Sequence, residues 1–417
     1  MSRRPRYIPA IVLTVFLDIL AFGLFIPDIQ LRGELLVHAL PISADATVLG
    51  VSVGKVLPGF LIGLLLALFS IAQLGAASVL GRLSDRVGRR KVLLFTTAMS
   101  LLGALVYTQA YSVGVLALSR VLMGLAAGNI AVAYAYISDV TPREDRAPAM
   151  GKLGIAFGLG FIFGPPIGGL LLKFGGDLPT LLGLVAAGLA LANLLYVYFL
   201  LPESLTERKE APDEFKAGVW RSLVNAIRTP GFGYLLVLFF VANFAMSNME
   251  STWFRLSISV FEIDKLEASL ILMEVGLVIA IVQGGLIRPL VKRFGEVRLL
   301  RAGYLLMGPA LALMPWMHPW IPALLIVAVL ATGSGFATPT LSSLISKLAP
   351  AAIAGGVFGI THSLGALARI IGPVVGSSLF ELYPWLPYAA AGSLMVIPIV
   401  MSRRIREPQP SPEPSGS

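Results

Sequence analysis

Four ionisable side chains lie deep inside long apolar stretches of the sequence, where the carboxyl groups could bind and release protons and the arginines could act as their cations. Asp18 lies near the middle of the first stretch, and Arg120 lies inside a later one. Glu274 and Arg369 lie at matching depths in two stretches of the C-terminal part. A charge inside a membrane is costly, so each of these side chains requires a partner, a proton or water. A carboxyl group that alternates between an apolar and a hydrated or cation-paired setting takes up a proton in the first and releases it in the second.

We therefore expect proton-coupling roles for all four residues, with two alternatives left open. Asp18 is either a proton carrier, with Arg120 as its favoured cation, or half of a fixed ion pair that only holds two helices together. Glu274 and Arg369 either pair directly or flank a cavity separately, as contacts for a proton and a substrate.

A further group of polar residues recurs at helical spacing in the stretch 231–256. Asn243, Ser247 and Glu250 follow one another at intervals of one helical turn, so they share a face of a helix. We expect that face to line the outer half of a cavity. For Asn243 and Ser247, hydrogen bonding between helices is the alternative.

The elements that position these residues are predicted to be membrane-spanning helices. The chain of 417 residues is 56% hydrophobic and only 13% charged, whereas soluble domains carry about a quarter charged residues. A helix crosses a membrane with roughly 20 mostly apolar residues, and the apolar stretches are too long for the strands of a barrel. We predict twelve spans, at 7–31, 55–80, 92–111, 113–138, 150–173, 179–202, 231–256, 267–290, 299–317, 319–345, 354–378 and 383–402.

The distribution of charge predicts the orientation of these spans. The net charge is +9, with 32 Lys and Arg against 23 Asp and Glu. Most of the cations fall in alternate loops, on the side of the amino terminus, and we assign only Arg120 and Arg369 to the interiors of spans. Such an excess marks the cytoplasmic side, so both termini are predicted to be cytoplasmic. The charge therefore reports topology in a cell membrane, most naturally a bacterial inner membrane, and not a nucleic-acid partner.

Several kinds of chemistry are not supported by the residues. The chain has no cysteine, which excludes disulfides and thiolate chemistry. Its three histidines are not clustered with carboxylates, so we predict no metal site. No phosphate-cradling glycine loop is present. We expect neither an enzyme nor a cofactor, with protons as the only coupling ion.

The sequence divides into two similar parts. The longest polar interval, 203–230, separates six predicted spans from six, and the glycines and proline of 151–169 recur in the segment that begins at 355. Gly164-Pro165 corresponds to Gly372-Pro373 in this repeat. We predict an N-terminal bundle (1–202), a cytoplasmic linker (203–230), a C-terminal bundle (231–404) and a disordered tail rich in Pro and Ser (405–417).

The basic segment GRLSDRVGRRK at 81–91 resembles the loop between helices 2 and 3 of major facilitator superfamily transporters. The matching positions are Gly81, Asp85, Arg86, Gly88, Arg89 and Arg90. In that family helices 2 and 11 meet at the inner gate. The resemblance implies that Asp85 caps the positive start of the helix near Ala354, while Arg86 and Arg89 brace it or bind anionic lipid headgroups.

Three further segments carry the same resemblance. The segment 118–129 resembles the helix 4 motif, and 17–29 resembles the helix 1 motif of tetracycline-type drug:proton antiporters. The segment 151–169 resembles the helix 5 motif of proton-coupled antiporters. That antiporter motif comprises Gly151, Gly160, Gly164, Pro165, Gly168 and Gly169.

The resemblance implies an all-α membrane protein with the major facilitator fold, in which twelve helices form two pseudo-symmetric six-helix bundles around a central substrate site. It is closest to the tetracycline-resistance-like branch of the twelve-span drug:proton antiporters. It implies export of a small hydrophobic compound, driven by inward proton movement, by a monomer among membrane lipids. The alternatives are a symporter or facilitator for a sugar, organic acid or lipid, and a non-transporting sensor. The expected substrate cavity comprises Phe22, Phe25, Asn129, Tyr136, Asn243, Ser247, Glu250 and His362.

Overall fold

The computed structural model describes residues 7–41, 47–48, 51–142, 145–176, 178–205, 232–317, 320–349 and 357–405. Their secondary structure is almost entirely helical, apart from one hairpin in which β1 (Thr47–Val48) pairs antiparallel with β2 (Val51–Ser52). The first group of helices is α1 (Ile8–His38), α2 (Val53–Val87), α3 (Arg89–Tyr107), α4 (Val113–Ala126), α5 (Asn129–Val140), α6 (Arg146–Gly175) and α7 (Pro179–Leu200). The second group is α9 (Gly233–Ser259), α10 (Lys265–Ile281), the π-helical turn η4 (Val282–Leu286), α11 (Ile287–Phe294), α12 (Glu296–Leu313), the short 3-10 helix η5 (Met314–Trp316), α13 (Trp320–Leu348), α14 (Val357–Leu382), α15 (Leu386–Leu394) and α16 (Val396–Ser402).

Hydropathy and length make most of these helices able to cross a membrane. Within the described residues, eleven helical segments are long and apolar enough to do so, with α4 and α5 counted as one segment and α10 to α11 as another. The predicted span 383–402 corresponds to a shorter apolar helix pair, Leu386–Ser402. The prediction of a helical protein with many apolar spans is confirmed, while the crossing of the twelfth segment stays a prediction.

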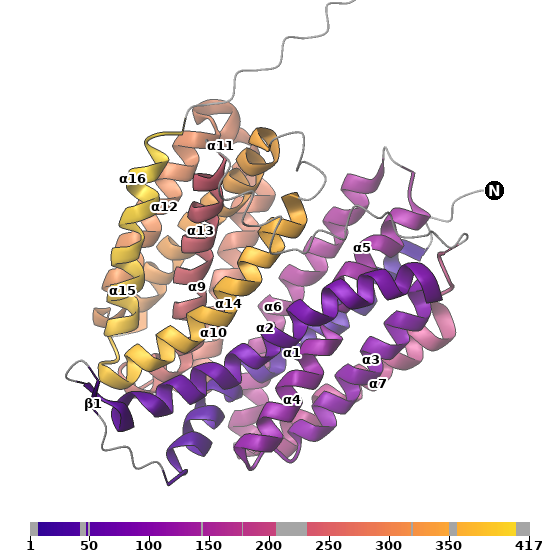
Figure 1. Cartoon of the computed structure of the whole chain (residues 1–417), viewed down its shortest axis with the longest axis horizontal. Helices are drawn as coiled ribbons and strands as arrows, with labels where there is room; N and C mark the ends of the chain where they lie inside the picture. The colour runs from indigo at the N-terminus through magenta and orange to yellow at the C-terminus, as the bar shows by residue number, and fades with distance from the viewer. Residues whose placement is uncertain are drawn as a thin grey trace, which may run out of the picture.

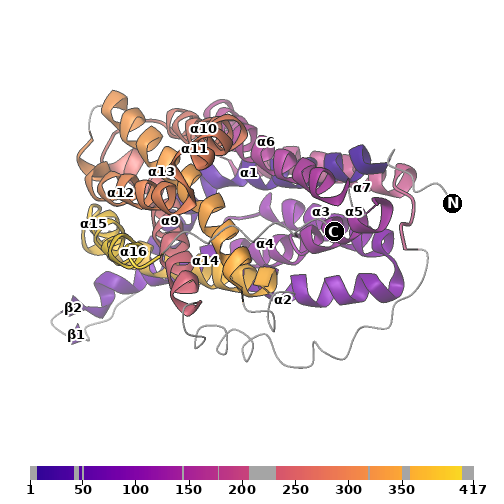
Figure 2. The same ribbon diagram turned by 90° about the horizontal axis from the view of Figure 1, so that it is seen from above.

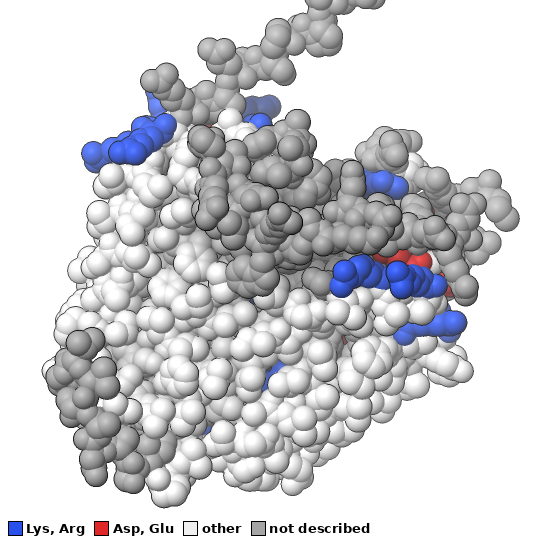
Figure 3. Space-filling view, viewed as in Figure 1, with Lys and Arg blue, Asp and Glu red and all other residues white. Residues whose placement is uncertain are grey.

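The two groups of helices lie side by side (Figures 1 and 2). We call the end that holds the β1–β2 hairpin the hairpin end, and the opposite end, at which α1 begins and α16 ends, the terminal end (Figure 1). In Figure 1 the two groups are close at the hairpin end and diverge towards the terminal end. Figure 3 shows Lys and Arg gathered near the terminal end, above a broad band that is nearly free of charge on this face.

Within each group, a glycine-rich helix packs on the first helix of that group. A Cβ atom added to Gly164 of α6 would lie 2.6 Å from the Cα of Gly23 in α1, so the two backbones touch. In the second group, a Cβ atom on Gly372 of α14 would lie 2.8 Å from the Cβ of Ser247 in α9. Small residues allow such close approach of helices in lipid. The two copies of the Gly-Pro repeat therefore make equivalent helix contacts.

Two helix pairs hold the groups together. A side chain on Gly63 of α2 would overlap the backbone of α14 at Pro373. Gly169 of α6 lies against α10, where an added Cβ would be 2.7 Å from the Oγ of Ser269. Figure 2 likewise places α14 beside α2 and α10 beside α6.

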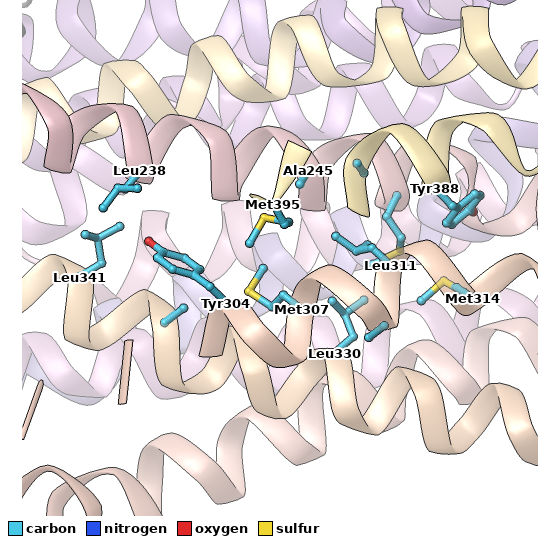
Figure 4. Close-up of a cluster of buried hydrophobic side chains, with 14 of the residues drawn as sticks. Leu238, Ala245, Tyr304, Met307, Leu311, Met314, Leu330, Leu341, Tyr388 and Met395 are labelled. Carbon is cyan, nitrogen blue, oxygen red and sulfur yellow. The ribbon is translucent and has the colours of Figure 1, made fainter. Parts of the chain in front are cut away.

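The second group has a continuous apolar core that lies between α9, α12, α13 and α15. Tyr304, Met307 and Leu311 project from α12 into this core, towards Leu341 of α13 and Met395 (Figure 4). Tyr304 is fully buried, and its hydroxyl has no hydrogen-bond partner among the described residues. These side chains fix the wall of the cavity described below.

Helix α1 is longer than predicted, and this corrects the assignment of charges to spans. The predicted end at residue 31 is exceeded by α1, which continues to His38. Arg32 therefore lies inside a helix and is only 7% exposed, and Arg255 in α9 is only 2% exposed. We expected only Arg120 and Arg369 to lie inside spans. Arg32 and Arg255 are two further cations there, and each is paired with acidic side chains, which lowers the cost of its burial.

Candidate functional site

Asp18 is held by two asparagine side chains from separate helices. The Nδ2 group of Asn193 in α7 donates a hydrogen bond of 2.8 Å to the Oδ1 of Asp18, and the Nδ2 group of Asn129 donates to Oδ2. Asn193 also donates to the carbonyl of Thr14, one turn earlier in α1. This arrangement leaves the carboxyl group near the middle of α1 with amide donors and no cation among the described side chains.

Arg120 lies against aromatic rings, and no ion pair joins it to Asp18 within the described residues. Its guanidinium carbon lies 4.8 Å from the centre of the Phe69 ring and 5.8 Å from that of Phe22. Its Nε is buried and has no hydrogen-bond partner there. Asp18 and Arg120 therefore do not form a fixed ion pair in this conformation. Arg120 makes cation–π contacts with the rings instead of a contact with the carboxylate.

A cavity of about 180 Å³ lies within the second group of helices. Its polar lining comes from Asn243 and Glu250 of α9 and from Ser334 and Thr338 of α13. The apolar lining is formed by Phe239, Ala242, Met246, Val275, Ile279, Tyr304, Met307, Ala337 and Leu341. Glu250 is exposed although it lies within α9, since its side chain faces this space.

Arg369 of α14 interacts electrostatically with Glu250, but the two side chains do not form an ion pair within the described part of the chain. Glu274 of α10 shows no comparable interaction with Arg369, and its Oε2 is buried without a hydrogen-bond partner among the described residues. Glu274 and Arg369 therefore do not pair directly in this conformation, and their side chains are separate.

The remaining residues expected in the cavity divide into two sets. Phe22 packs on Phe69, with ring centres 4.6 Å apart. His362 is exposed on α14. For both residues, a place on a surface between the two groups of helices stays a prediction. Phe25 and Ser247 are buried, Phe25 against the ring of Tyr107 and Ser247 against α14.

Two further side chains serve other roles than the expected one. Tyr136 is fully buried and donates a hydrogen bond of 3.0 Å to the carbonyl of Pro202. Asn129 is buried and is committed to Asp18. Phe25, Tyr136 and Asn129 belong to the first group and Ser247 packs against α14, so none of the four is among the residues that line the cavity inside the second group.

Polar contacts between the two groups gather at the hairpin end. Arg255 of α9 bonds to Glu34 of α1 at 2.8 Å and to Glu381 of α14 at 2.7 Å. His38, at the end of α1, lies 3.3 Å from the same Glu381. The guanidinium carbon of Arg255 lies 4.3 Å from the centre of the Phe380 ring. One buried cation thus joins helices of both groups.

A second cluster at the hairpin end is built around Asp28. This carboxylate accepts hydrogen bonds from Arg32 at 2.5 Å and from the hydroxyl of Tyr107 at 2.7 Å. Lys265 of α10, in the other group, lies 3.9 Å away. At the edge of the same end, Lys173 of α6 bonds to Asp264 at 2.9 Å. These contacts close the hairpin end of the molecule.

Gln30 provides another contact between the groups. Its Nε2 donates a hydrogen bond of 2.7 Å to the carbonyl of Glu250, and its Oε1 accepts one of 3.1 Å from the backbone N–H of Phe254. Gln30 is only 4% exposed. Helix α1 is thus bonded to the backbone of Glu250, whose carboxylate faces the cavity.

The loop 81–91 is braced at the terminal end by an ionic network within the first group. Arg89 lies 2.6 Å from Asp85 and 3.0 Å from Asp139 of α5. The carboxylate of Glu203 accepts hydrogen bonds from the backbone N–H groups of Arg89 and Arg90, at 2.8 and 3.2 Å. Buried Arg89 therefore pairs with Asp85 inside the first group. The expected docking of Asp85 near Ala354 lies outside the described residues.

The glycines of the motifs differ in the space around them. Gly88 has φ of +109°, and a side chain there would overlap Glu203. Of the antiporter motif, Gly160, Gly164 and Gly168 face α1, Gly169 faces α10, and Gly151 has open space around it.

Sequence reasoning missed Asn193, Gln30, Arg255, Glu203 and Asp28. Asp28 and Arg32 are separated by one helical turn, which is an available signal for an ion pair inside α1. Asn193 is an amide within an apolar stretch, and such side chains usually bond across helices. For Gln30 and Glu203 no comparable pattern exists, since their partners are backbone groups far away in the sequence.

These features agree with the comparisons to known proteins. The family model of the Major Facilitator Superfamily matches residues 11–373 and 289–417. The chain therefore belongs to the Major Facilitator Superfamily of membrane transporters. The predicted membership is confirmed.

Individual relatives include drug-resistance proteins. The class D tetracycline resistance protein of Salmonella ordonez is 31% identical, over 76% of this chain and 79% of the relative. Multidrug resistance protein 2 of Bacillus subtilis (strain 168) is 29% identical, over 82% of this chain and 85% of its own length. Among solved structures, the human organic anion transporter MFSD10 (TETRAN) is 25% identical, with a TM-score of 0.68 over 96% of this chain and 100% of that one.

Proposed function

We propose that this transporter is a proton-coupled antiporter that exports a small, largely hydrophobic compound from the cytoplasm. The observation that carries the proposal is the setting of Asp18. A carboxyl group near the middle of a membrane span, bonded by Asn129 and Asn193 and not by a cation, can be neutralised by a proton. Similarity to tetracycline and multidrug resistance proteins supports export as the direction.

The arrangement of the two groups supports alternating access. Polar contacts between them lie at the hairpin end, around Arg255, Gln30 and Asp28. We assign the terminal end, where Lys and Arg gather (Figure 3), to the cytoplasm. This conformation is then closed to the outside. The cavity beside Glu250 is the proposed substrate site, with Met and aromatic side chains for apolar compounds.

The test measures proton movement and substrate uptake in liposomes that contain the purified protein. An imposed proton gradient should drive uptake of at least one hydrophobic compound from a panel by the wild type. Asp18→Asn should abolish this coupling. Glu262→Gln, which changes an exposed carboxylate at the hairpin end, serves as the matched control and should leave it intact. Coupled transport by Asp18→Asn would contradict the proposal.

A second candidate function is transport of an organic anion. It is favoured by two cations inside apolar helices, Arg120 and Arg369, which form no ion pair among the described residues, and by the similarity to human MFSD10. Adding organic anions to the same panel separates the two candidates. Flux of anions alone, reduced by Arg369→Gln, would favour the second.

A further inference from the structure

The contact between Gln30 and α9 has an unusual geometry. Glu250 and Phe254 are four residues apart in α9, so in a regular helix the N–H of Phe254 bonds to the carbonyl of Glu250. In the structure both groups bond to the side-chain amide of Gln30. The amide of α1 thus reproduces, from outside, the two halves of one helical hydrogen bond.

Helix α9 is a continuous α-helix over Gly233–Ser259, so the amide of Gln30 binds to this part of the helix from outside. Its two hydrogen bonds tie α1 to one turn of α9. Because a buried amide that loses its partners costs free energy, the contact favours the conformation in which the two helices meet.

The position of this contact connects the closed end with the cavity. On one side, Gln30 lies between Asp28 and Glu34 on α1, both of which bond to side chains of the other group. On the other side, the carbonyl that it binds belongs to Glu250, whose side chain lines the cavity. Movement of α1 away from α9 must therefore release the backbone of a cavity residue.

We propose that Gln30 is a positioning residue that couples closure of the hairpin end to the placement of Glu250 in the cavity. While the amide occupies α9, the hairpin end stays closed and Glu250 is held at its observed place. When Gln30 leaves, α1 no longer holds the turn of α9 that carries Glu250, and that turn can move relative to the cavity. The element with two states is the contact between α1 and α9 at Gln30, and both the closed end and the cavity bias its equilibrium.

The test uses distances between spin labels on the full-length protein in lipid nanodiscs. Because the natural chain has no cysteine, labels can be placed at single introduced cysteines. Leu178 and Trp316 report on the hairpin end, and Lys91 and Lys292 report on the terminal end, with one residue of each pair in each group.

Gln30→Leu removes both hydrogen bonds and keeps a side chain of similar length. We expect it to lengthen the Leu178–Trp316 distance, shorten the Lys91–Lys292 distance and raise the ratio of outward-open to inward-open molecules about tenfold. Gln109→Leu changes an exposed glutamine near the same end and should match the wild type. Unchanged distances in folded Gln30→Leu would overturn the proposal.

A second variant separates this role from general packing. Gln30→Glu keeps the acceptor for Phe254 but donates to the Glu250 carbonyl only when it is protonated. Its difference from the wild type should therefore shrink as the pH falls, whereas the effect of Gln30→Leu should persist. The charged groups that face this position are Asp28, Arg32 and Glu34 on α1, Arg255 on α9 and Lys265 on α10. Because these groups are present in every variant, each curve is compared with that of the wild type. A pH-independent Gln30→Glu would contradict the proposed role of the Gln30 amide.

The link to the cavity is tested by combining Gln30→Leu with Glu250→Gln. If Gln30 positions Glu250, the effect of Glu250→Gln on the distances should be smaller in the Gln30→Leu background than in the wild type, since coupled residues are non-additive. Equal effects in the two backgrounds would show that Gln30 and Glu250 act independently. The inference rests on alternating access in the proposed function, but these distances are measured without substrate. If no proton-coupled flux were found, the distance measurements would therefore still test the role of Gln30.

Discussion

At the scale of single residues, amides and rings take the places that opposite charges were expected to fill. Asp18 bonds to Asn193 and Asn129, and Arg120 lies on Phe69 and Phe22. An amide donor stabilises a carboxylate less strongly than a cation does. Asp18 and Arg120 are therefore not locked in an ion pair, so Asp18 keeps the capacity to bind a proton and Arg120 the capacity to bind a ligand.

Gly88 shows how strictly one residue of the 81–91 loop is constrained. Gly88→Ala should lower the stability of the protein by about 1 to 3 kcal/mol, because non-glycine residues are strained at such backbone angles and because the added carbon would overlap Glu203. Thermal unfolding in detergent measures the loss. Gly81→Ala is the matched control: its position is helical with open space around it, so it should be neutral or stabilising by about 0.5–1 kcal/mol. Equal stability of the two variants would contradict this account.

The ion pair between Lys173 and Asp264 predicts a defined dependence on pH. Partial burial disfavours the charged form of Asp264, but the backbone N–H groups of Glu267 and Leu266 and the Lys173 ammonium outweigh it and lower the pKa of Asp264 below its ordinary 3.8. A carboxylate with a lowered pKa stabilises the folded state above its ordinary pKa and loses this effect as the pH falls through the lowered value.

Asp264→Asn should therefore destabilise the protein equally at about pH 7 and pH 5, and the difference from the wild type should fade only near pH 3. Thermal unfolding at the three pH values measures it. A difference that already disappears at about pH 5 would show that the pKa of this carboxyl is not lowered.

At the scale of elements, helix α6 is defined by the small residues on two of its faces. Gly160, Gly164 and Gly168 bring it against α1, while Gly169 brings it against α10 of the other group. A helix with small residues towards both neighbours can approach each of them closely and can slide without meeting side chains. This gives a physical reason for the motif, with α6 placed between a helix of its own group and one of the opposite group.

Substitution along α6 should separate tight positions from open ones. Gly164→Ala should destabilise the protein by about 1 to 3 kcal/mol through overpacking, since its Cβ would lie 2.6 Å from the Cα of Gly23. It should also reduce transport. Gly158→Ala, on the same helix with open space around it, should change neither. Melting temperature and liposome flux are the two measurements, and full activity of Gly164→Ala would contradict the close approach.

At the scale of the whole molecule, closure at the hairpin end depends on side chains from both groups. Arg255 joins Glu34 and Glu381 there, while Gln30 and Lys265 add contacts with α9 and α1. Alternating access requires these contacts to break and re-form in each transport cycle. Ion pairs that are buried in one state and solvated in the other make such an exchange possible.

A cross-link across the hairpin end should stop transport. Lys173 and Asp264 lie in different groups, with 2.9 Å between Nζ and Oδ2, so cysteines at both positions should react with a short cleavable linker. Flux in liposomes should cease after cross-linking and return after cleavage. The control pair is Tyr111 and Thr180, whose hydroxyls are 3.0 Å apart within the first group. Cross-linking that pair should leave flux intact, and continued flux of the Lys173–Asp264 cross-linked protein would argue against alternating access.

Local composition and motif spacing were sufficient to predict the helical spans and the family. Apolar stretches longer than a membrane is thick predict helices, because a backbone in lipid must satisfy its own hydrogen bonds. Motif spacing identified the family, as with Gly88 and its neighbours. These conclusions needed no knowledge of which helices touch.

Which side chains meet could be learned only from the folded arrangement of the helices. Asp18 with Asn193, Glu203 with the 81–91 loop and Gln30 with α9 each join residues far apart in the sequence. Such contacts depend on the rotation and depth of each helix relative to its neighbours. In a chain that is apolar on nearly all helix faces, periodicity gives little information about that rotation. The same limit explains why Phe25 and Tyr136 were expected in the cavity but are packed in the core.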